Sequence, residues 1–176
     1  MRPADLTPLA RDVMKGPASS GLMFLSIVGA FVLAVLPWSG EWLLARPDFV
    51  LLVILFWTLH EPRSIGQGVA FALGLLMDVS DSMLLGQHAF AYVIVVCLAQ
   101  VLRVRILSFH MPEQTLHVLA MTCTAAGVML GLNLLLGASF PGPVFFVSPV
   151  LTALLWAPVN GLLYSAAVRR RREGSS

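Results

Sequence analysis

Long apolar runs, separated by short clusters of charged residues, proline and glycine, are the feature that most constrains this chain. Hydrophobic residues make up 58% of its 176 residues and charged residues only 11%, whereas soluble domains average about 25% charged. The runs do not alternate between apolar and polar residues, so a transmembrane β-barrel is not expected. The sequence therefore predicts an all-α integral membrane protein.

Six of these runs have the length or the apolarity of membrane spans. They divide the chain into an N-terminal segment (1–19), a transmembrane domain of six helices (20–168) and a basic tail (169–176). A basic head before the first run is also typical of a signal peptide, but Leu36-Pro37-Trp38 offers no small-residue cleavage site. We therefore expect the first run to be an uncleaved helix. The six runs cover about residues 20–36, 47–59, 64–79, 87–102, 113–136 and 144–168.

The second run is the shortest. Its thirteen residues extend roughly 20 Å as a helix, whereas the hydrocarbon core is roughly 30 Å thick. Either residues 42–45 lengthen this helix, or it lies inside the bundle, where neighbouring helices shield Arg46 and Asp48. Pro47 and Asp48 fit a helix start, because proline suits the first turn and an acid faces the positive end of the helix dipole.

The basic residues predict the orientation in the membrane. With six spans, the 11 Lys and Arg residues all fall on one side except Arg46. Cytoplasmic loops are enriched in Lys and Arg, so we expect both termini in the cytoplasm. Pro62 and Arg63 then turn the chain on the cytoplasmic side, whereas Asp78 and Gly86, a helix-start or turn residue, lie at the outer edge.

Small residues recur at every fourth position in several runs. Gly66, Ala70 and Gly74 share one helix face, and the same register places Asp78 at its end. Small residues let helices approach closely in lipid. Such faces serve either packing within the chain or docking of a partner helix, and the sequence does not distinguish the two uses. Comparable stripes are Ser26/Ala30/Ala34, Gly127/Gly131 and Ala153/Ala157/Gly161/Ser165.

Charged residues near hydrocarbon need partners. Arg46 and Asp78 lie at equal sequence distances from Pro62, so an antiparallel hairpin brings them to a similar depth. We therefore predict an ion pair between Arg46 and Asp78. The alternative is that Asp78 lies at the headgroup level and Asp48 only begins a helix, because charge costs far less near the end of a span than at its centre.

Polar residues inside the runs allow two interpretations. They either form hydrogen bonds between helices or line a cavity for a ligand or a transported solute. Pro158 predicts a local kink in the sixth run. The polar residues concerned are Thr58, Gln87, His88, Gln100, Asn133 and Asn160.

No sequence motif indicates catalysis. Asp78 and Asp81 form a single DxxD motif, which would hold a magnesium–phosphate unit only with further carboxylates nearby. The sequence contains no Ser/His/Asp arrangement, HExxH motif or glycine-rich phosphate loop, and its histidines lack metal-ligand spacing. Cys97 and Cys123 fall inside apolar runs and are expected to be packing residues rather than a disulfide. We expect no enzyme, no metal and no cofactor.

The order of motifs resembles the MreD family of rod shape-determining membrane proteins. Arg46-Pro47-Asp48-Phe49, followed by an apolar run to Phe56-Trp57, resembles the family's second helix. The third helix and the loop after it are matched by Glu61-Pro62-Arg63, Gly66-Gln67-Gly68, Gly74-Leu75-Leu76-Met77-Asp78 and Leu85-Gly86. The likeness covers nearly the whole chain and is most specific over residues 46–92.

This resemblance implies a non-enzymatic role in building the lateral cell wall, in the inner membrane of a Gram-negative bacterium. The family works in the elongation machinery (the elongasome or rod complex) with MreC, MreB, the glycosyltransferase RodA and its partner transpeptidase. Its fold is similar to that of the S components of energy-coupling-factor vitamin transporters. The Ser26/Ala30/Ala34 stripe is similar to the small-residue docking face of that transporter class.

The leading hypothesis is therefore a membrane scaffold that binds MreC and helps control peptidoglycan synthesis. The runner-up is an S-component-like protein that binds a small solute or a lipid carrier, and an intramembrane enzyme is a distant third. We expect contact with membrane lipids, no nucleic acid, and self-association as a further option. The candidate partner-binding or structural residues are Ala30, Ala34, Arg46, Pro47, Asp48, Pro62, Arg63, Gly66, Ala70, Gly74, Asp78 and Gly86.

Overall fold

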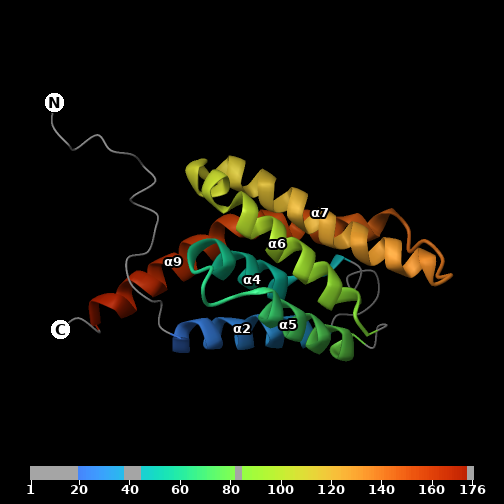
Figure 1. Cartoon of the computed structure of the whole chain (residues 1–176), viewed down its shortest axis with the longest axis horizontal. Coiled ribbons are helices and arrows are strands. Elements are labelled where there is room, and N and C mark those ends of the chain that lie inside the picture. Colours follow the sequence, from blue (N-terminus) through green and yellow to red (C-terminus); the bar gives the residue numbers. More distant parts are fainter. Residues whose placement is uncertain (1–19, 38–44, 82–84, 174–176) are drawn as a thin grey trace.

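The computed structural model describes residues 20–37, 45–81 and 85–173 as a bundle of helices (Figure 1). No strand occurs in these ranges, which confirms the prediction of an all-α protein. The elements in chain order are α2 (Ser20–Val35), α4 (Phe49–His60), α5 (Gln67–Ser80), α6 (Gln87–Ser108), α7 (Met111–Leu135), the short 3₁₀ helix η2 (Pro143–Phe146), α8 (Val147–Leu154) and α9 (Trp156–Glu173).

The helices fall into two length classes. Within the described ranges, three helical stretches are long and apolar enough to cross a membrane, namely Gln87–Ser108, Met111–Leu135 and Pro143–Arg169. The apolar helices α2, α4 and α5 are shorter, with 16, 12 and 14 residues. The start of α2 and the end of α9 lie at the same end of the bundle, as an even number of crossings requires (Figure 1).

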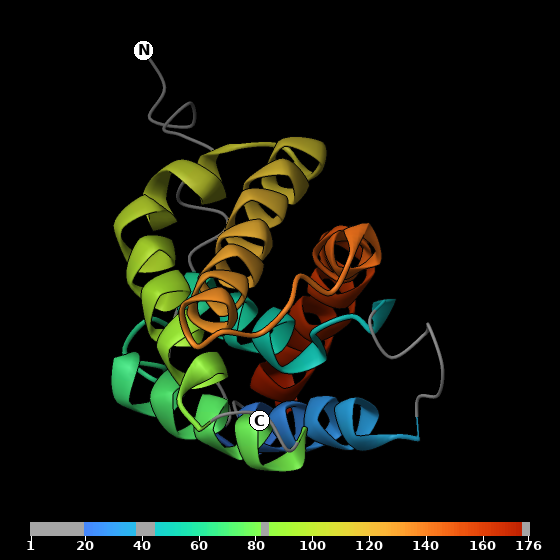
Figure 2. The ribbon, with the colours of Figure 1, turned by 90° about the vertical axis from the view of Figure 1, so that its right-hand side faces the viewer.

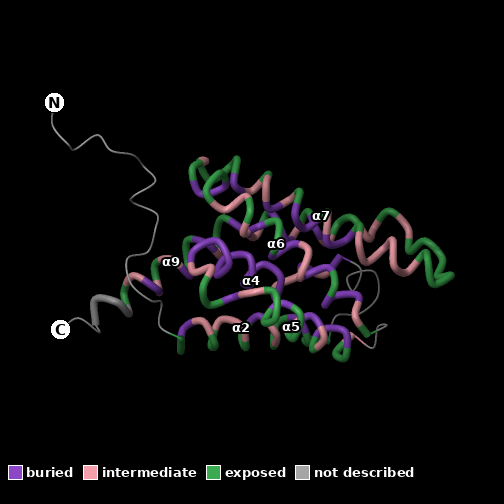
Figure 3. The backbone as a smooth tube through the Cα atoms, viewed as in Figure 1, coloured by how far each residue is buried: buried purple, intermediate pink, exposed green. Residues whose placement is uncertain are grey.

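Helix α4 lies at the centre of the bundle. It contacts α2, α6, α8 and α9, and Figure 2 shows it between these helices. All its residues from Val50 to His60 are buried, as the purple tube of Figure 3 shows. A helix that is apolar on every side suits such a position. This burial confirms the interpretation that the short second run lies inside the bundle.

Two boundaries differ from the sequence prediction. Helix α6 does not end near residue 102 but continues to Ser108, so Arg103 and Arg105 belong to the helix rather than to a linker. The Arg103 Nε–H donates to the Leu59 carbonyl at 2.5 Å, which ties α6 to the last turn of α4. Helix α7 then begins at Met111, where the Glu113 carboxylate accepts a hydrogen bond from the His110 N–H.

The predicted sixth span is one helical stretch with a break. It consists of η2, α8 and α9, with a turn at Leu155 between α8 and α9. Pro158 has no N–H to donate, and its ring crowds the carbonyl one turn earlier, so the helix cannot continue regularly through this point. The prediction of a kink at Pro158 is confirmed.

Two of the small-residue stripes pack against helices of the same chain. Ala30 and Ala34 are 4% and 1% exposed, on the helix that packs against α4, and Ala70 on α5 is fully buried. A Cβ built at Gly74 would lie 2.3 Å from the Ala89 Cα, so glycine is required where α5 meets the start of α6. These two faces are therefore closed by helices of the same chain.

Most of the other small residues lie on open surfaces, although Ala153 on α8 is buried. A Cβ at Gly127, Gly131 or Gly161 would meet nothing within 4 Å. Gly66 is also open and only precedes the first turn of α5. The expectation that Cys97 and Cys123 are packing residues is wrong, because both are exposed free thiols on the outside of the bundle.

Candidate functional site

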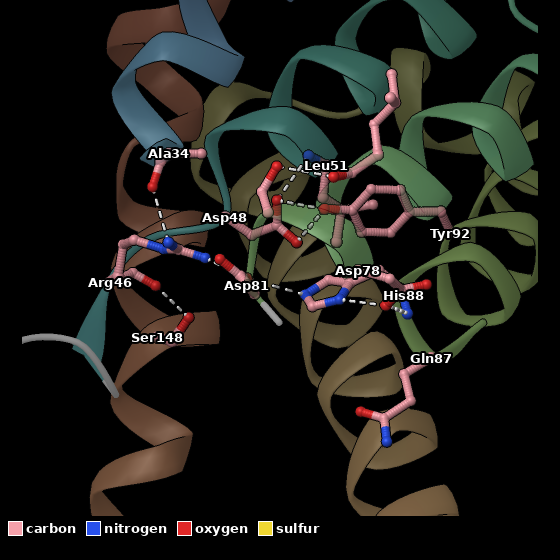
Figure 4. Close-up of polar contacts among 12 residues, drawn as sticks. Ala34, Arg46, Asp48, Leu51, Asp78, Asp81, Gln87, His88, Tyr92 and Ser148 are labelled. Carbon is pink, nitrogen blue, oxygen red and sulfur yellow. Dashed lines mark hydrogen bonds and ion pairs between the residues drawn. The ribbon is translucent and has the colours of Figure 1, made fainter. Parts of the chain in front are cut away.

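A group of charged side chains gathers where α4 and α6 begin and α2 and α5 end (Figure 4). Arg46 and Asp48 come from the segment before α4, Asp78 and Asp81 from the end of α5, and His88 from the first turn of α6. Residues far apart in the chain thus meet at one end of the bundle.

The Asp78 carboxylate caps the start of α6. It is fully buried and accepts hydrogen bonds from the N–H groups of Gly86 (2.7 Å) and His88 (2.9 Å). It also accepts one from Nδ1 of the His88 ring at 2.8 Å; Nδ1 carries the proton because a carboxylate only accepts. The first N–H groups of a helix lack partners inside the helix and carry its positive dipole end. This explains how a charge can be buried at the end of α5.

Gly86 makes this cap possible. Its backbone has φ 106°, in the left-handed region that a residue with a side chain rarely adopts. This turn directs the first N–H groups of α6 back toward Asp78. The prediction that Gly86 starts a helix or makes a turn is confirmed.

Arg46 pairs with Asp81 rather than with Asp78. Its Nη2 lies 2.6 Å from the Asp81 Oδ2, and its Nη1 donates to the Ala34 carbonyl at 2.7 Å. The predicted Arg46–Asp78 pair is wrong, because Asp78 is occupied by the start of α6. The predicted depth of Arg46 is correct to one helical turn, since Asp81 follows Asp78 by three residues on the same face.

Asp48 links three helices. Its Oδ1 accepts a hydrogen bond from the Leu51 N–H at 2.8 Å, as expected for the residue that begins α4. The Tyr92 hydroxyl, on α6, lies 2.8 Å from both carboxylate oxygens of Asp48. The Asp48 N–H donates to the Thr152 Oγ1 on α8, also at 2.8 Å. The prediction that Asp48 is a helix-start residue is confirmed.

These groups line a cavity of about 370 Å³. Its charged or titratable residues are Arg46, Asp48, Asp81 and His88, and it is also lined by the hydroxyl residues Ser80, Thr122, Ser148 and Thr152. Its apolar part comes from α2, α4, α5, α7 and η2, and includes Leu51, Met77, Ala126, Met129 and Phe145. A volume of this size, with apolar walls and a few convergent polar groups, is typical of small-molecule sites in proteins.

Most of the predicted intramembrane polar residues form hydrogen bonds between segments of the chain. Gln87 and Asn133 exchange two amide hydrogen bonds of 2.8 and 3.2 Å, joining α6 to α7. Gln100 accepts from Gln67 at 3.0 Å, joining α6 to α5. Two buried oxygens, Thr58 Oγ1 and Asn160 Oδ1, have no partner within the described ranges.

The DxxD motif does not form a metal site. Asp78 is occupied by α6 and His88, and Asp81 is occupied by Arg46. In the part of the chain that the structure describes, no three His, Cys, Asp or Glu side chains are arranged to hold a metal ion.

The remaining predicted residues lie apart from this site. Pro62 and Arg63 form the turn between α4 and α5, at the other end of the bundle, whereas buried Pro47 lies between Arg46 and Asp48. The roles of Asp81, Tyr92 and Thr152 were not predicted from the sequence. Asp81 could have been found, because it lies one turn after Asp78, but nothing in the sequence relates Tyr92 or Thr152 to Asp48.

Comparison with known proteins gives a consistent result. The family model of the rod shape-determining protein MreD matches residues 18–166 of the chain. A curated relative, the rod shape-determining protein MreD of Haemophilus influenzae, is 38% identical over 60 residues. That alignment covers 34% of this chain and 37% of the relative, little more than a third of each. No solved structure matches the chain.

Proposed function

Because this chain belongs to the MreD family of rod shape-determining proteins, we propose that it is a non-enzymatic scaffold of the cell-elongation machinery. In this proposal it lies in the inner membrane, binds MreC, and so helps control lateral peptidoglycan synthesis. RodA, its partner transpeptidase and MreB are further members of the same machinery. Family membership supports the role in rod shape, and the geometry of the bundle supports the binding of a membrane partner.

The observation that supports a bound partner helix is the open small-residue face of α7. We define the α7 open face as Ala120, Cys123, Gly127 and Gly131, which are exposed or half-buried along one side of the helix. Helices associate in lipid by close packing over such residues. The faces of α2 and α5 are closed within the chain, which leaves α7 and α9 to offer small residues outward.

We choose α7 over α9 because α7 also leads to the cavity. Ala125, Ala126 and Met129 on its other side line the cavity. A partner helix on the α7 open face would therefore lie against the helix that borders the cavity. The juxtamembrane part of MreC would then reach the outer end of the scaffold.

The experiment is co-purification of MreC with variants of this chain. Gly127→Leu combined with Gly131→Leu should abolish co-purification, because two leucines would hold the partner helix away. Gly161→Leu on α9 is the matched control and should bind MreC normally, since its Cβ also meets nothing within 4 Å. Wild-type recovery of MreC with the α7 double variant would refute this docking face.

The orientation of the bundle is part of the proposal. Arg63 lies in the turn between α4 and α5, and Arg103 binds the Leu59 carbonyl, so both lie at the end away from the cavity. Loops rich in Lys and Arg face the cytoplasm. The cavity end would then face the periplasm. In a variant whose exposed native Cys97 and Cys123 are replaced by alanine, an impermeant thiol reagent added from the periplasmic side should label Ser80→Cys but not Arg63→Cys.

A second candidate function, the binding of a small solute, is favoured by the cavity itself. A carrier lipid with a phosphate head fits poorly, because Asp48 and Asp81 line the cavity beside a single arginine. Two like charges 4 Å apart repel by roughly 4 kcal/mol at an effective dielectric constant of about 20. Mass spectra of the purified chain showing a bound small molecule, with no MreC recovered, would favour this candidate over the scaffold.

A further inference from the structure

The cavity lining includes one carboxylate that forms no ion pair within the described ranges. Arg46 and Asp81 form an ion pair at 2.6 Å and neutralise each other. Asp78, behind the cavity wall, is stabilised by the start of α6 and by His88. Asp48 is then the remaining carboxylate on the cavity lining.

Arg46 and His88 act on Asp48 through space, but no cation contacts its carboxylate within the described ranges. Among the described residues, its two oxygens accept hydrogen bonds from the Leu51 N–H and the Tyr92 hydroxyl, both of which are neutral donors. Within the described ranges, no Lys, Arg or His nitrogen lies within 4.0 Å of its carboxylate. An ionised carboxylate offers about four acceptor sites, so Asp48 can still receive a donor from the cavity.

Apolar side chains complete the site. Leu51, Ala126, Met129 and Phe145 line the cavity together with Asp48. Such walls exclude water from a bound apolar group and strengthen a charge-assisted hydrogen bond at the carboxylate.

We propose that this cavity binds a cationic group (an ammonium, amidinium or guanidinium) carried on an apolar body, with the cation on Asp48. The Arg46–Asp81 pair would keep these two lining residues in place without attracting anions. This inference goes beyond the scaffold role and does not depend on it, because the cavity belongs to the isolated chain.

The test uses three probes of one shape and different charge: benzamidine, benzamide and benzoate. The full chain is placed in phosphatidylcholine nanodiscs, and binding is measured by saturation-transfer difference NMR against empty nanodiscs. Benzamidine should bind with an affinity about tenfold above that of benzamide, the ratio expected for one hydrogen bond to a charged group. Benzoate should give no signal above empty nanodiscs. Equal binding of benzamidine and benzamide, or no binding of benzamidine, would overturn the proposal.

Two variants test whether the cation binds at Asp48. Asp48→Asn keeps a good residue for the start of α4 but removes the charge, so benzamidine affinity should fall about tenfold, to that of benzamide. Glu113→Gln, an exposed carboxylate on α7 that lies outside the cavity lining, is the matched control and should bind like wild type. A preference for benzamidine that persists in Asp48→Asn would place the cation elsewhere.

A second variant keeps the test decisive if Asp48→Asn fails to fold. Ala126→Phe leaves Asp48 and its hydrogen bonds intact and fills part of the apolar cavity. Benzamidine binding should be lost in this variant, with an unchanged size-exclusion profile. Full binding by folded Ala126→Phe would show that the probe binds outside the cavity and would overturn the proposal.

A further experiment, benzamidine binding to the co-purified complex with MreC, distinguishes a protein side chain from a small molecule as the natural cation. If a basic side chain of a bound protein occupies Asp48, benzamidine binding should disappear in the co-purified complex with MreC. If a small molecule occupies it, benzamidine binding should persist in that complex. Either result leaves the proposed docking face on α7 to be judged by co-purification alone.

Discussion

Helices α5 and α7 carry the same sequence pattern and use it differently. Both have small residues spaced four apart, with Ala70 and Gly74 on α5 and Gly127 and Gly131 on α7. On α5, the Ala89 backbone lies so close to Gly74 that even a Cβ has no room. On α7, a Cβ at either glycine meets open space.

The difference teaches that a small-residue stripe predicts close approach but not the identity of the neighbour. The α5 stripe ends on Asp78, whose carboxylate binds the start of α6 and fixes the two helices together. Within the described ranges, the α7 stripe does not end on a carboxylate, and Asn133, which bonds Gln87 on α6, lies outside the register of the stripe. A stripe with an anchor is closed within this chain, whereas a stripe without one faces outward.

The largest expected effect is that of Gly74→Ala. The added Cβ would lie 2.3 Å from the Ala89 Cα and 2.5 Å from the Ala89 N, which are backbone atoms that cannot rotate away. Overpacking of this kind costs typically 1–3 kcal/mol, and we expect about 3 kcal/mol of lost stability. Denaturation by SDS, followed by the fluorescence of buried Trp57 and Trp156, measures it. A stability equal to wild type would mean that α5 and α6 are not packed this closely.

The next effect is that of Asp78→Asn. The amide keeps one acceptor but turns its NH₂ group toward the N–H groups of Gly86 or His88, which are themselves donors. An unsatisfied buried donor costs about 1–3 kcal/mol, so we expect a loss of about 2 kcal/mol in the same SDS titration. Ser80→Ala is the control, because Ser80 is exposed near the same helix end and its hydroxyl only bonds its own helix. A loss no greater than that of Ser80→Ala would show that Asp78 does not anchor α6.

The helices of this fold could be predicted from the sequence because apolarity and length decide them almost alone. The apolar runs predicted the bounds of α2, α4, α5 and α7 to within a few residues, and Pro158 predicted the break near the start of α9. The end of α6 was placed too early, because Arg103 and Arg105 looked like the end of a span. Both arginines can be part of α6 because this helix extends past the end of α4, where the Leu59 carbonyl accepts a hydrogen bond from Arg103.

The site was predictable only in part. Hairpin geometry correctly predicted that Arg46 lies near the end of α5. Which of the two acids it contacts depends on the left-handed turn at Gly86, because the Gly86 N–H donates a hydrogen bond to the Asp78 carboxylate. Tyr92 and Thr152 reach Asp48 from positions 44 and 104 residues away in the chain. Such contacts, and the cavity they border, depend on how several helix ends meet, which periodicity does not encode.

A double-mutant cycle separates the two acids that could partner Arg46. Arg46→Gln and Asp81→Asn should couple by about 1 kcal/mol, as expected for residues in direct contact, whereas Arg46→Gln and Asp78→Asn should be additive within about 0.5 kcal/mol. SDS denaturation of the three single variants, the two double variants and wild type provides both cycles. The reverse pattern would restore the Arg46–Asp78 pair predicted from the sequence.

The smallest expected effect is that of Gly127→Ala, the counterpart of Gly74→Ala on the open stripe. Its Cβ enters open space, so the stability of the isolated chain should change by less than about 0.5 kcal/mol, as for surface substitutions in general. The comparison becomes sharper when MreC is present. A partner helix packed on the α7 open face would meet the new methyl group, so Gly127→Ala should weaken co-purification while Gly161→Ala does not. If Gly127→Ala destabilises the isolated chain as much as Gly74→Ala does, the α7 stripe is closed within the chain after all, and the distinction between an anchored stripe and an open one fails.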